Sequence, residues 1–280
     1  MTHLKLLVPL AALLALGAAS AAPTALNVTA TGKGYAAPAS VRAGYVTLTF
    51  KNAGKTPIDI EFFRLKPGGT EARFKSLAAG VAKQSPKDAS YQLVSVVDAV
   101  GGVGDVPPGQ NVSATFQLKP GKYILTSLDS DDKTKKMAMS QGYYKYLTVT
   151  GPALNNPPAK ADYSVNMVDY RFELPTGVTA GTHTWHIANS GHEAHFTMLA
   201  KLLPGKTMDD VMKAMSASDQ SGPPPVDFEH ASFAQVLTNG QAEDVTWNLS
   251  KGSYVAVCFV EDKRGVPHAA MGMMQELNVK

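Results

Sequence analysis

Four side chains near the C-terminal end of the chain could hold a metal ion together. His195, Cys258, His268 and Met273 supply one thiolate, two imidazoles and one thioether. Two imidazoles and a thiolate with a weak axial thioether form a trigonal copper centre of the blue type. Cys258 is the only cysteine in the 280 residues, so it cannot form an internal disulfide. Binding a metal would explain its presence.

An internal repeat lets each of these positions be compared with a second one. From Pro38 onward, residues match others 137 positions later, as Asn52 matches Asn189. Farther along, the offset is 131 and then 130, and Tyr123 matches Tyr254. So many matches in register indicate two copies of one domain.

All four candidate ligands are replaced in the first copy, while the surrounding framework stays. The positions that match His195, Cys258, His268 and Met273 hold, in that order, Ile58, Ser127, Ala138 and Tyr143. One functional difference explains four joint replacements better than independent drift does. We therefore expect one copper ion per chain, bound by the second copy.

The start of the chain has the pattern of a secretory signal peptide over residues 1–21. Lys5 precedes a short apolar run, and Ala19-Ser20-Ala21 is a cleavage signal. The first copy then spans residues 22–150 and the second 162–280, joined by a proline-rich surface linker at 151–161. We expect export to the periplasm or the extracellular space, without a membrane span, because no later segment approaches ~18 apolar residues in a row.

Several function classes are not indicated. The 26 basic and 23 acidic residues give a net charge of +3, without a basic patch, so nucleic-acid binding is not expected. His192-Glu-Ala-His195 is one residue short of a zinc-protease motif, and Gly101-Gly-Val-Gly104 lacks the lysine of a phosphate-binding loop. The chain contains no His-x-His pair of the kind found in coupled copper clusters. Without an acid–base pair or an activated nucleophile, we do not expect an enzyme.

The residue pattern predicts short strands with frequent turns. Strands are expected at 45–50, 182–187, 196–202, 245–249, 254–260 and 273–279. One short helix per copy is expected: Thr207 caps the second, and Thr70 opens the first. Residues 216–234, rich in Ser, Gly and Pro, are expected to be irregular. This pattern predicts an all-β fold, either a sandwich or a barrel.

Three segments of the second copy resemble the cupredoxin family. In Gly252–Cys258 a tyrosine precedes the cysteine by four, in His268–Met273 the methionine follows a glycine, and in Asn189–His195 an Asn-x-Gly turn leads to histidine. The resemblance implies two tandem Greek-key β-sandwich domains, only the second with ligands. It also implies His195, Cys258 and His268 as equatorial ligands and Met273 as the axial one.

The spacing before the last histidine departs from the family pattern. Nine residues separate Cys258 from His268, where the family usually has two to four. The turn-like segment 261–265 would have to bulge outward and return His268 to the site. A blue trigonal centre, a red or green variant and an empty pocket are all compatible with this spacing.

Each candidate also has a purely structural interpretation. Cys258 could be a small core residue, Met273 a core methionine and His268 a solvated loop residue. Strand parity with Leu277 favours Met273 over Met274 as a ligand. Met271 is a weaker alternative, and we do not expect the other histidines after the signal peptide to bind, namely His183, His186, His192 and His230.

Three functions follow, in decreasing order of preference. The first is one-electron transfer, with a redox protein partner docking on the apolar loop around His268. The second is the handling of Cu(I) by soft thioethers, which would come from Met198, Met271, Met273 and Met274. The third is a metal-free structural or partner-binding module. The sequence does not indicate the oligomeric state.

Overall fold

The computed structural model describes residues 21–81, 89–127, 138–216 and 222–280. All but the last residue of the predicted signal peptide therefore lie outside the described residues. We call residues 21–150 the N-terminal half and residues 162–280 the C-terminal half. No helix in the described ranges is long and apolar enough to cross a membrane.

The described chain consists mainly of strands. Those of the N-terminal half are β1 (Thr24–Thr31), β2 (Gly34–Ala36), β3 (Ser40–Arg42), β4 (Gly44–Asn52), β5 (Ile58–Leu65), β6 (Val97–Val106), β7 (Asn111–Leu118), β8 (Gly121–Thr126) and β9 (Tyr144–Thr150). Those of the C-terminal half are β10 (Tyr163–Val168), β11 (Arg171–Glu173), β12 (Gly181–Asn189), β13 (His195–Leu202), β14 (Val226–Leu237), β15 (Ala242–Leu249), β16 (Gly252–Val257) and β17 (Met274–Val279).

The helices are few and short. They are α1 (Glu71–Val81), α2 (Ala89–Val94) and α3 (Met208–Ser216), with 3-10 turns η2 (Ala138–Gln141) and η3 (His268–Met271). Thr207 begins α3 as expected: its hydroxyl accepts a hydrogen bond from the backbone N–H of Asp210 at 3.4 Å. The structure adds α2 to the helix that was expected in the N-terminal half.

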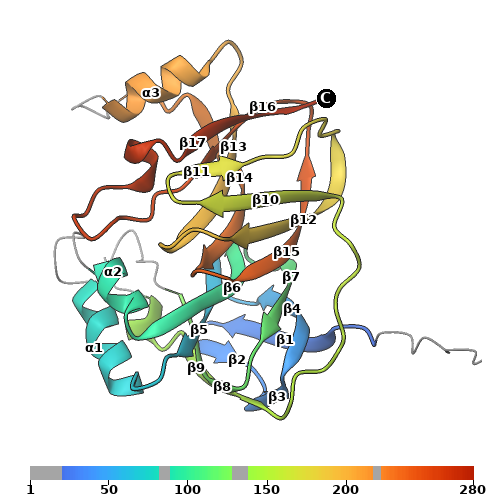
Figure 1. Cartoon of the computed structure of the whole chain (residues 1–280), viewed down its shortest axis with the longest axis vertical. Helices are drawn as coiled ribbons and strands as arrows, with labels where there is room; N and C mark the ends of the chain where they lie inside the picture. Colours follow the sequence, from blue (N-terminus) through green and yellow to red (C-terminus); the bar gives the residue numbers. More distant parts are fainter. Residues whose placement is uncertain (1–20, 82–88, 128–137, 217–221) are drawn as a thin grey trace, which may run out of the picture.

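Two sheets run through both halves of the molecule (Figure 1). The first has the order β11-β10-β12-β15-β7-β4-β1-β2, and the second has the order β17-β16-β13-β14-β6-β5-β8-β9-β3. The halves join edge to edge, β15 against β7 and β14 against β6, and we call this line the seam. Strands that match in the sequence repeat occupy mirrored places in each sheet, as β4 and β12 do.

The two sheets enclose one continuous core, so the fold is an all-β sandwich. Alternate residues of β4 point inward, and Val46, Leu48 and Phe50 are each 0 % exposed. Trp185 does the same on β12 and packs against Trp247, with ring centroids 5.3 Å apart. A single apolar cluster contains residues of both halves. All six predicted strands form, with ends that differ by up to three residues.

The two seam strands of the second sheet were not predicted. The expectation of irregular structure over 216–234 is wrong for 226–234, because β14 begins at Val226, while residues 217–221 lie outside the described residues. β6 contains the glycine run that superficially resembled a phosphate loop. There, a Cβ on Gly102 would collide with the carbonyl oxygen of Ile60 on β5, so the glycine permits close strand packing.

The predicted linker between the halves contains neither strand nor helix over residues 151–162. It is not wholly a surface segment, since Asn156 is 0 % exposed. The Asn156 side chain accepts a hydrogen bond from the Tyr45 N–H at 2.9 Å and donates one to the Tyr45 carbonyl at 2.8 Å. This part of the linker is therefore attached to β4. The division into two separate domains stays a prediction.

Candidate metal centre

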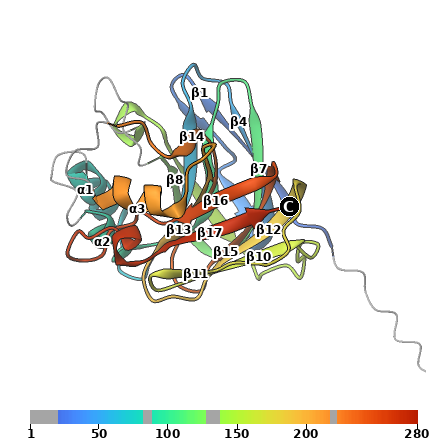
Figure 2. The same cartoon turned by 90° about the horizontal axis from the view of Figure 1, so that it is seen from above.

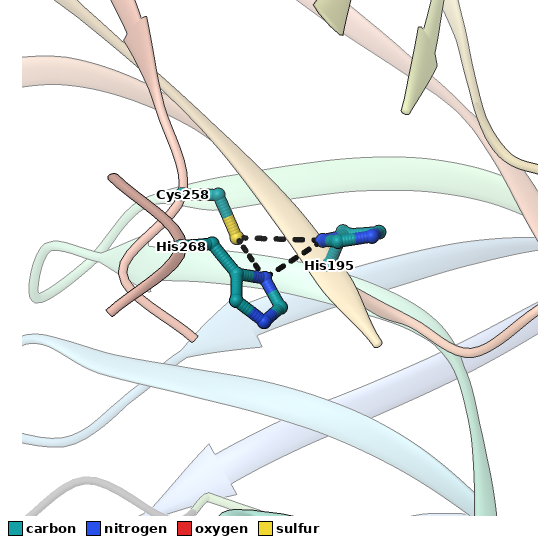
Figure 3. Close-up of side chains that lie close together, drawn as sticks. All are labelled: His195, Cys258 and His268. Carbon is teal, nitrogen blue, oxygen red and sulfur yellow. Dashed lines mark hydrogen bonds between the residues drawn. The ribbon is translucent and has the colours of Figure 1, made fainter. Parts of the chain in front are cut away.

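Three donor atoms from distant segments meet in the interior of the C-terminal half (Figure 3). His195 opens β13, Cys258 directly follows β16, and His268 opens η3. The two Nδ1 atoms lie 2.9 Å apart, and Cys258 Sγ lies 3.9 Å from Nδ1 of His195 and 3.7 Å from Nδ1 of His268. All three residues are 0 % exposed. The convergence expected of a competent site is therefore present.

The long segment between Cys258 and His268 leaves the site and comes back. A bridge between Glu261 and Pro267 closes it, and the Asp262 carboxylate accepts hydrogen bonds from the N–H groups of Arg264 and Val266 at 2.8 and 3.0 Å. Beyond the bridge, the His268 N–H donates to the carbonyl of Val260 at 2.8 Å. The extra residues therefore form a closed loop that does not displace the histidine.

Met273 lies beside the three donors through its backbone. Its N–H donates to the carbonyl of His268 at 2.9 Å, and its own carbonyl accepts from the N–H of Cys258 at 3.2 Å. The side chain is 0 % exposed and belongs to the same apolar cluster as Cys258. These contacts fix the residue next to two of the donors, while a role as axial ligand stays a prediction.

A carboxylate holds the other nitrogen of His195. Asp169 lies in the turn between β10 and β11, and its Oδ1 is 3.2 Å from Nε2 of His195. The same oxygen accepts the backbone N–H groups of His192 and Glu193 at 2.8 and 3.1 Å. Burial acts to raise the pKa of Asp169, but the hydrogen bonds from Glu193, His192 and His195 outweigh it and bring the pKa to about 2. Asp169 is therefore an anion that anchors the imidazole.

A second carboxylate does the same for His268. Oε2 of Glu193 lies 3.0 Å from Nε2 of His268, and Oε1 accepts the Tyr170 hydroxyl at 3.3 Å. The Tyr170 ring meets the His268 ring edge to face, with centroids 5.4 Å apart. Both imidazoles thus direct Nε2 to a carboxylate and Nδ1 to the thiol.

Burial controls the ionisation of the donor atoms. It raises the pKa of the Cys258 thiol to about 12. Burial is also the largest cause of the lowered pKa of His195, against the hydrogen bond from Asp169 that raises it. Without a metal, Cys258 is therefore a thiol and His195 a neutral imidazole.

This donor set fits a copper ion. With Nε2–H given to a carboxylate, each Nδ1 presents a lone pair to the point where the sulfur also lies. Trigonal ligands with bonds of about 2.0 to 2.3 Å lie roughly 3.5 to 3.8 Å from one another. The two distances to Cys258 Sγ match, and the 2.9 Å between the Nδ1 atoms must widen by about half an ångström. His195, Cys258 and His268 would hold the ion, with Met273 beside them.

Neither the two carboxylates nor the role of the glycine that lets them approach was predicted from the sequence. A Cβ on Gly191 would lie 2.5 Å from Oδ1 of Asp169 and 3.0 Å from Nε2 of His195, so only glycine fits. The Asn-x-Gly turn before His195 was a signal for this glycine. Asp169 and Glu193 had no such signal, because an acidic residue in a turn is ordinary.

Four other histidines of the described residues lie outside the cluster of donors. His192 lies in the turn before β13, and its side chain is 93 % exposed. His186 pairs with Asp244 at 2.6 Å, and His183 lies against Tyr163. His230 is exposed on β14 and pairs with Asp227.

No protein-family model and no curated protein matches this sequence. Solved structures with a similar fold include the dithionite-reduced auracyanin of the photosynthetic bacterium Roseiflexus castenholzii, at 19 % identity and a TM-score of 0.32, over 46 % of this chain and 99 % of that chain. Auracyanin A, a "blue" copper protein of Chloroflexus aurantiacus, matches at 18 % identity and a TM-score of 0.31 over the same shares. A multicopper oxidase matches at 14 % identity and a TM-score of 0.26, over 91 % of this chain and 88 % of that chain. At such low scores, only the geometry of the site in this chain bears on function.

Proposed function

We propose that this chain is an exported one-electron carrier with a single copper ion bound in its C-terminal half. The observation that carries the proposal is the convergence of one buried thiol and two buried imidazoles within 3.9 Å, each imidazole anchored by a carboxylate. A thiolate and two imidazoles are donors that copper accepts in both of its common oxidation states.

The surroundings suit electron transfer better than catalysis. Bound copper supplies a one-electron couple, and the protein must keep its donors in place in both states. A carboxylate holds Nε2 of His195 and of His268, the metal would hold each Nδ1, and the 0 % exposure of all donors excludes bulk water. A fixed, dry site needs little rearrangement when the charge changes, and it offers no open face to a substrate.

Metal binding must displace the proton of Cys258. Because burial raises the pKa of this thiol to about 12, the thiolate forms only with the metal. The anions of Asp169 and Glu193 then lie behind the imidazoles and balance part of the positive charge. Binding should therefore release a proton.

Visible absorption on adding Cu²⁺ to the metal-free protein tests the proposal. We expect an intense thiolate-to-copper band at a stoichiometry of one, and its loss in Cys258→Ser, which introduces the residue of the matching position Ser127. With Cu²⁺ at ~100 Kd, binding should stabilise the wild type by about 3 kcal/mol and the variant hardly at all. A wild type that stays colourless with a titratable thiol would sink the proposal and leave the metal-free module.

Handling of Cu(I) is the alternative, and the methionines do not favour it. Met198 and Met274 pack in the cluster beneath α3, whereas Met273 lies in the main core with Cys258. The thioether of Met271 is 3.4 Å from the Arg264 guanidinium. The four thioethers thus do not form one soft site. A tight Cu⁺ complex without a reversible potential would support this alternative.

We also propose that the chain is exported after cleavage of its signal peptide. The cleavage pattern places the first residue of the mature chain at Ala22. Expression of the full chain with N-terminal sequencing of the secreted product tests it.

A further inference from the structure

None of the candidate ligands reaches the surface, since His195, Cys258, His268 and Met273 are all 0 % exposed. If the proposed electron transfer holds, a partner must therefore reach the centre through other residues. Electrons tunnel better through bonds and hydrogen bonds than across gaps. The hydrogen-bonded neighbours of the two imidazoles thus indicate where the centre meets the surface.

Both hydrogen-bonded routes lead to the same place. From His268 the route passes to Glu193 at 3.0 Å. From His195 it passes to Asp169 at 3.2 Å and from there to the ring of His192 at 2.8 Å. Glu193 and His192 both line a cleft of about 560 Å³. We call it the interhalf cleft.

The interhalf cleft lies between the two halves. The C-terminal half contributes His192 and Glu193 and the start of the loop that follows Cys258, at Val260 and Glu261. The opposite wall is formed by the N-terminal half, with residues of β5, of β6 and of α2, including Tyr91. Figure 1 and Figure 2 both show α2 next to the loop between β16 and β17. The half without ligands therefore completes the approach to the centre.

The excess of carboxylates in the interhalf cleft favours a partner with basic side chains. Among the described residues that line it, the carboxylates are Glu61, Asp98, Glu193 and Glu261, against one lysine, Lys66. Lys66 lies 3.5 Å from Asp98, so these two charges offset one another. Apolar side chains such as Leu93 and Val260 also line the cleft, and Tyr91 is 47 % exposed. A cleft with both acidic and apolar lining is complementary to lysine or arginine side chains, whose stems are apolar.

A larger depression of about 750 Å³ lies on the outer face of the C-terminal half, beneath α3. Pro267 and Ala270 of the loop around His268 line it, together with Phe228 and Phe259. This is the side on which the sequence analysis placed the docking patch. No residue that lines it accepts a hydrogen bond from an imidazole of the centre, in the part of the chain that the structure describes. The smaller cleft therefore has the better connection to the donors.

We propose that the interhalf cleft is the docking site of a basic electron-transfer protein, which inserts lysine or arginine side chains between Glu193 and the α2 wall. The partner then exchanges one electron with the centre through Glu193 and His268. The proposal rests on the proposed function for the electron step, but not for the docking itself.

Docking is tested on the metal-free protein, with a lysine-rich c-type cytochrome as the probe. Calorimetric titration at an ionic strength of about 10 mM should show a complex that disappears at 1 M salt, where the Debye length is about 3 Å. The double variant Asp98→Asn/Glu261→Gln should weaken binding about tenfold. The matched control Glu229→Gln/Glu276→Gln removes two exposed carboxylates outside the cleft and should change binding less than twofold.

The electron step is tested on the copper-loaded protein by stopped flow. One electron passes from Cu(I) to the ferric haem, which gives Cu(II) and ferrous haem. The cleft double variant should slow the bimolecular rate about tenfold at low salt, and the same cytochrome with succinylated lysines should react slowly with every form. Tyr91→Ala, which leaves all charges in place, should also slow the reaction by weakening contact with the cleft wall.

The outcomes separate the two proposals. Cleft-dependent docking in a protein that binds no copper would overturn only the proposed function. Equal binding by the cleft variant and its control would overturn the docking site. A loss of binding on replacing Phe228 and Phe259 by serine, with the cleft variant unaffected, would place docking in the groove beneath α3 and also overturn it.

Discussion

Positions that match in the sequence repeat hold side chains of different chemistry in the two halves of the molecule. His195 and Ile58 each open a strand, and Cys258 and Ser127 each follow one. Yet the C-terminal positions present three converging donors, whereas in the N-terminal half aromatic rings occupy this region. Tyr143, at the position of Met273, packs edge to face on Tyr35 with centroids 5.6 Å apart.

The framework around both places is conserved within the molecule. Asn52 and Asn189 each donate to two main-chain carbonyls at 2.6 to 2.8 Å, and each accepts the N–H of the glycine two residues later. The tyrosine corners also match, since Tyr123 and Tyr254 each donate to the carbonyl four residues earlier. The scaffold therefore positions these side chains regardless of their chemistry, and the halves differ in the side chains at and around the donor positions.

The largest effect should come from removing the shared asparagines. Asn52→Ala and Asn189→Ala each delete three hydrogen bonds of a buried side chain and should each lower the free energy of unfolding by about 3 kcal/mol. Urea unfolding measures both losses. Because Asn189 also holds the Glu193 carbonyl, only Asn189→Ala should alter the copper absorption band. An equal spectral change in Asn52→Ala would contradict the separation of framework and donors.

The seam between the halves should respond to pH through Glu243. This side chain is 1 % exposed and accepts the N–H groups of Gly102, across the seam, and Gln235 at 2.9 and 2.6 Å. Burial, the largest cause, raises its pKa from 4.5 to about 8. Between these values the folded protein holds a proton that the unfolded chain has lost, so stability falls as the pH rises.

The expected size of this effect is a loss of roughly 3 kcal/mol between pH 5 and pH 8. Urea unfolding at several pH values measures it. In Glu243→Gln this part of the pH dependence should vanish, although the variant also loses one acceptor. If the wild type and the variant have parallel pH profiles, Glu243 does not keep its proton in the seam.

The carboxylates behind the imidazoles occur only in the C-terminal half, because the positions that match Asp169 and Glu193 hold Gly32 and Thr56. Glu193→Gln and Asp169→Asn should each weaken copper binding by about 10- to 100-fold. Competition titration against a chelator measures the affinity. Glu173→Gln is the matched control, since this carboxylate is exposed on β11 and pairs with Arg171. Affinities within twofold of the wild type would show that the imidazoles need no anchoring.

The smallest effect should be the same in both halves. Tyr123→Phe and Tyr254→Phe each remove one hydrogen bond to a carbonyl, at 2.8 and 2.9 Å, and should each cost about 1 kcal/mol. Tyr254→Phe also removes a longer hydrogen bond, of 3.2 Å, with the Ser250 hydroxyl, which should add little. Thermal unfolding compares the two variants. Tyr163→Phe, near the molecular surface, is the control. A much larger loss of stability for Tyr254→Phe would mean that the two tyrosines do not contribute equally to the framework of the two halves.

Sequence reasoning found the strands whose residues alternate, because period-2 burial is a local property. It missed β6 and β14, the seam strands of the second sheet, for a physical reason. β6 contains paired glycines that only close packing explains, and β14 follows the proline run 223–225, which reads as a loop. Their strand character comes from pairing that the local pattern does not show, since β6 pairs with β5 and β14 pairs with β13.

Residue type alone determined the candidate donors, since a single cysteine with two histidines and a methionine is a distinctive chemical set, and the repeat isolated the four positions. Only the tertiary structure decided that the nine-residue excursion returns His268 to the sulfur, and that Asp169 and Glu193 lie behind the imidazoles. The reason is the separation along the chain over which each property is determined. Donor chemistry belongs to each side chain, whereas hydrogen bonds between residues 26 and 75 positions apart exist only after the strands have paired.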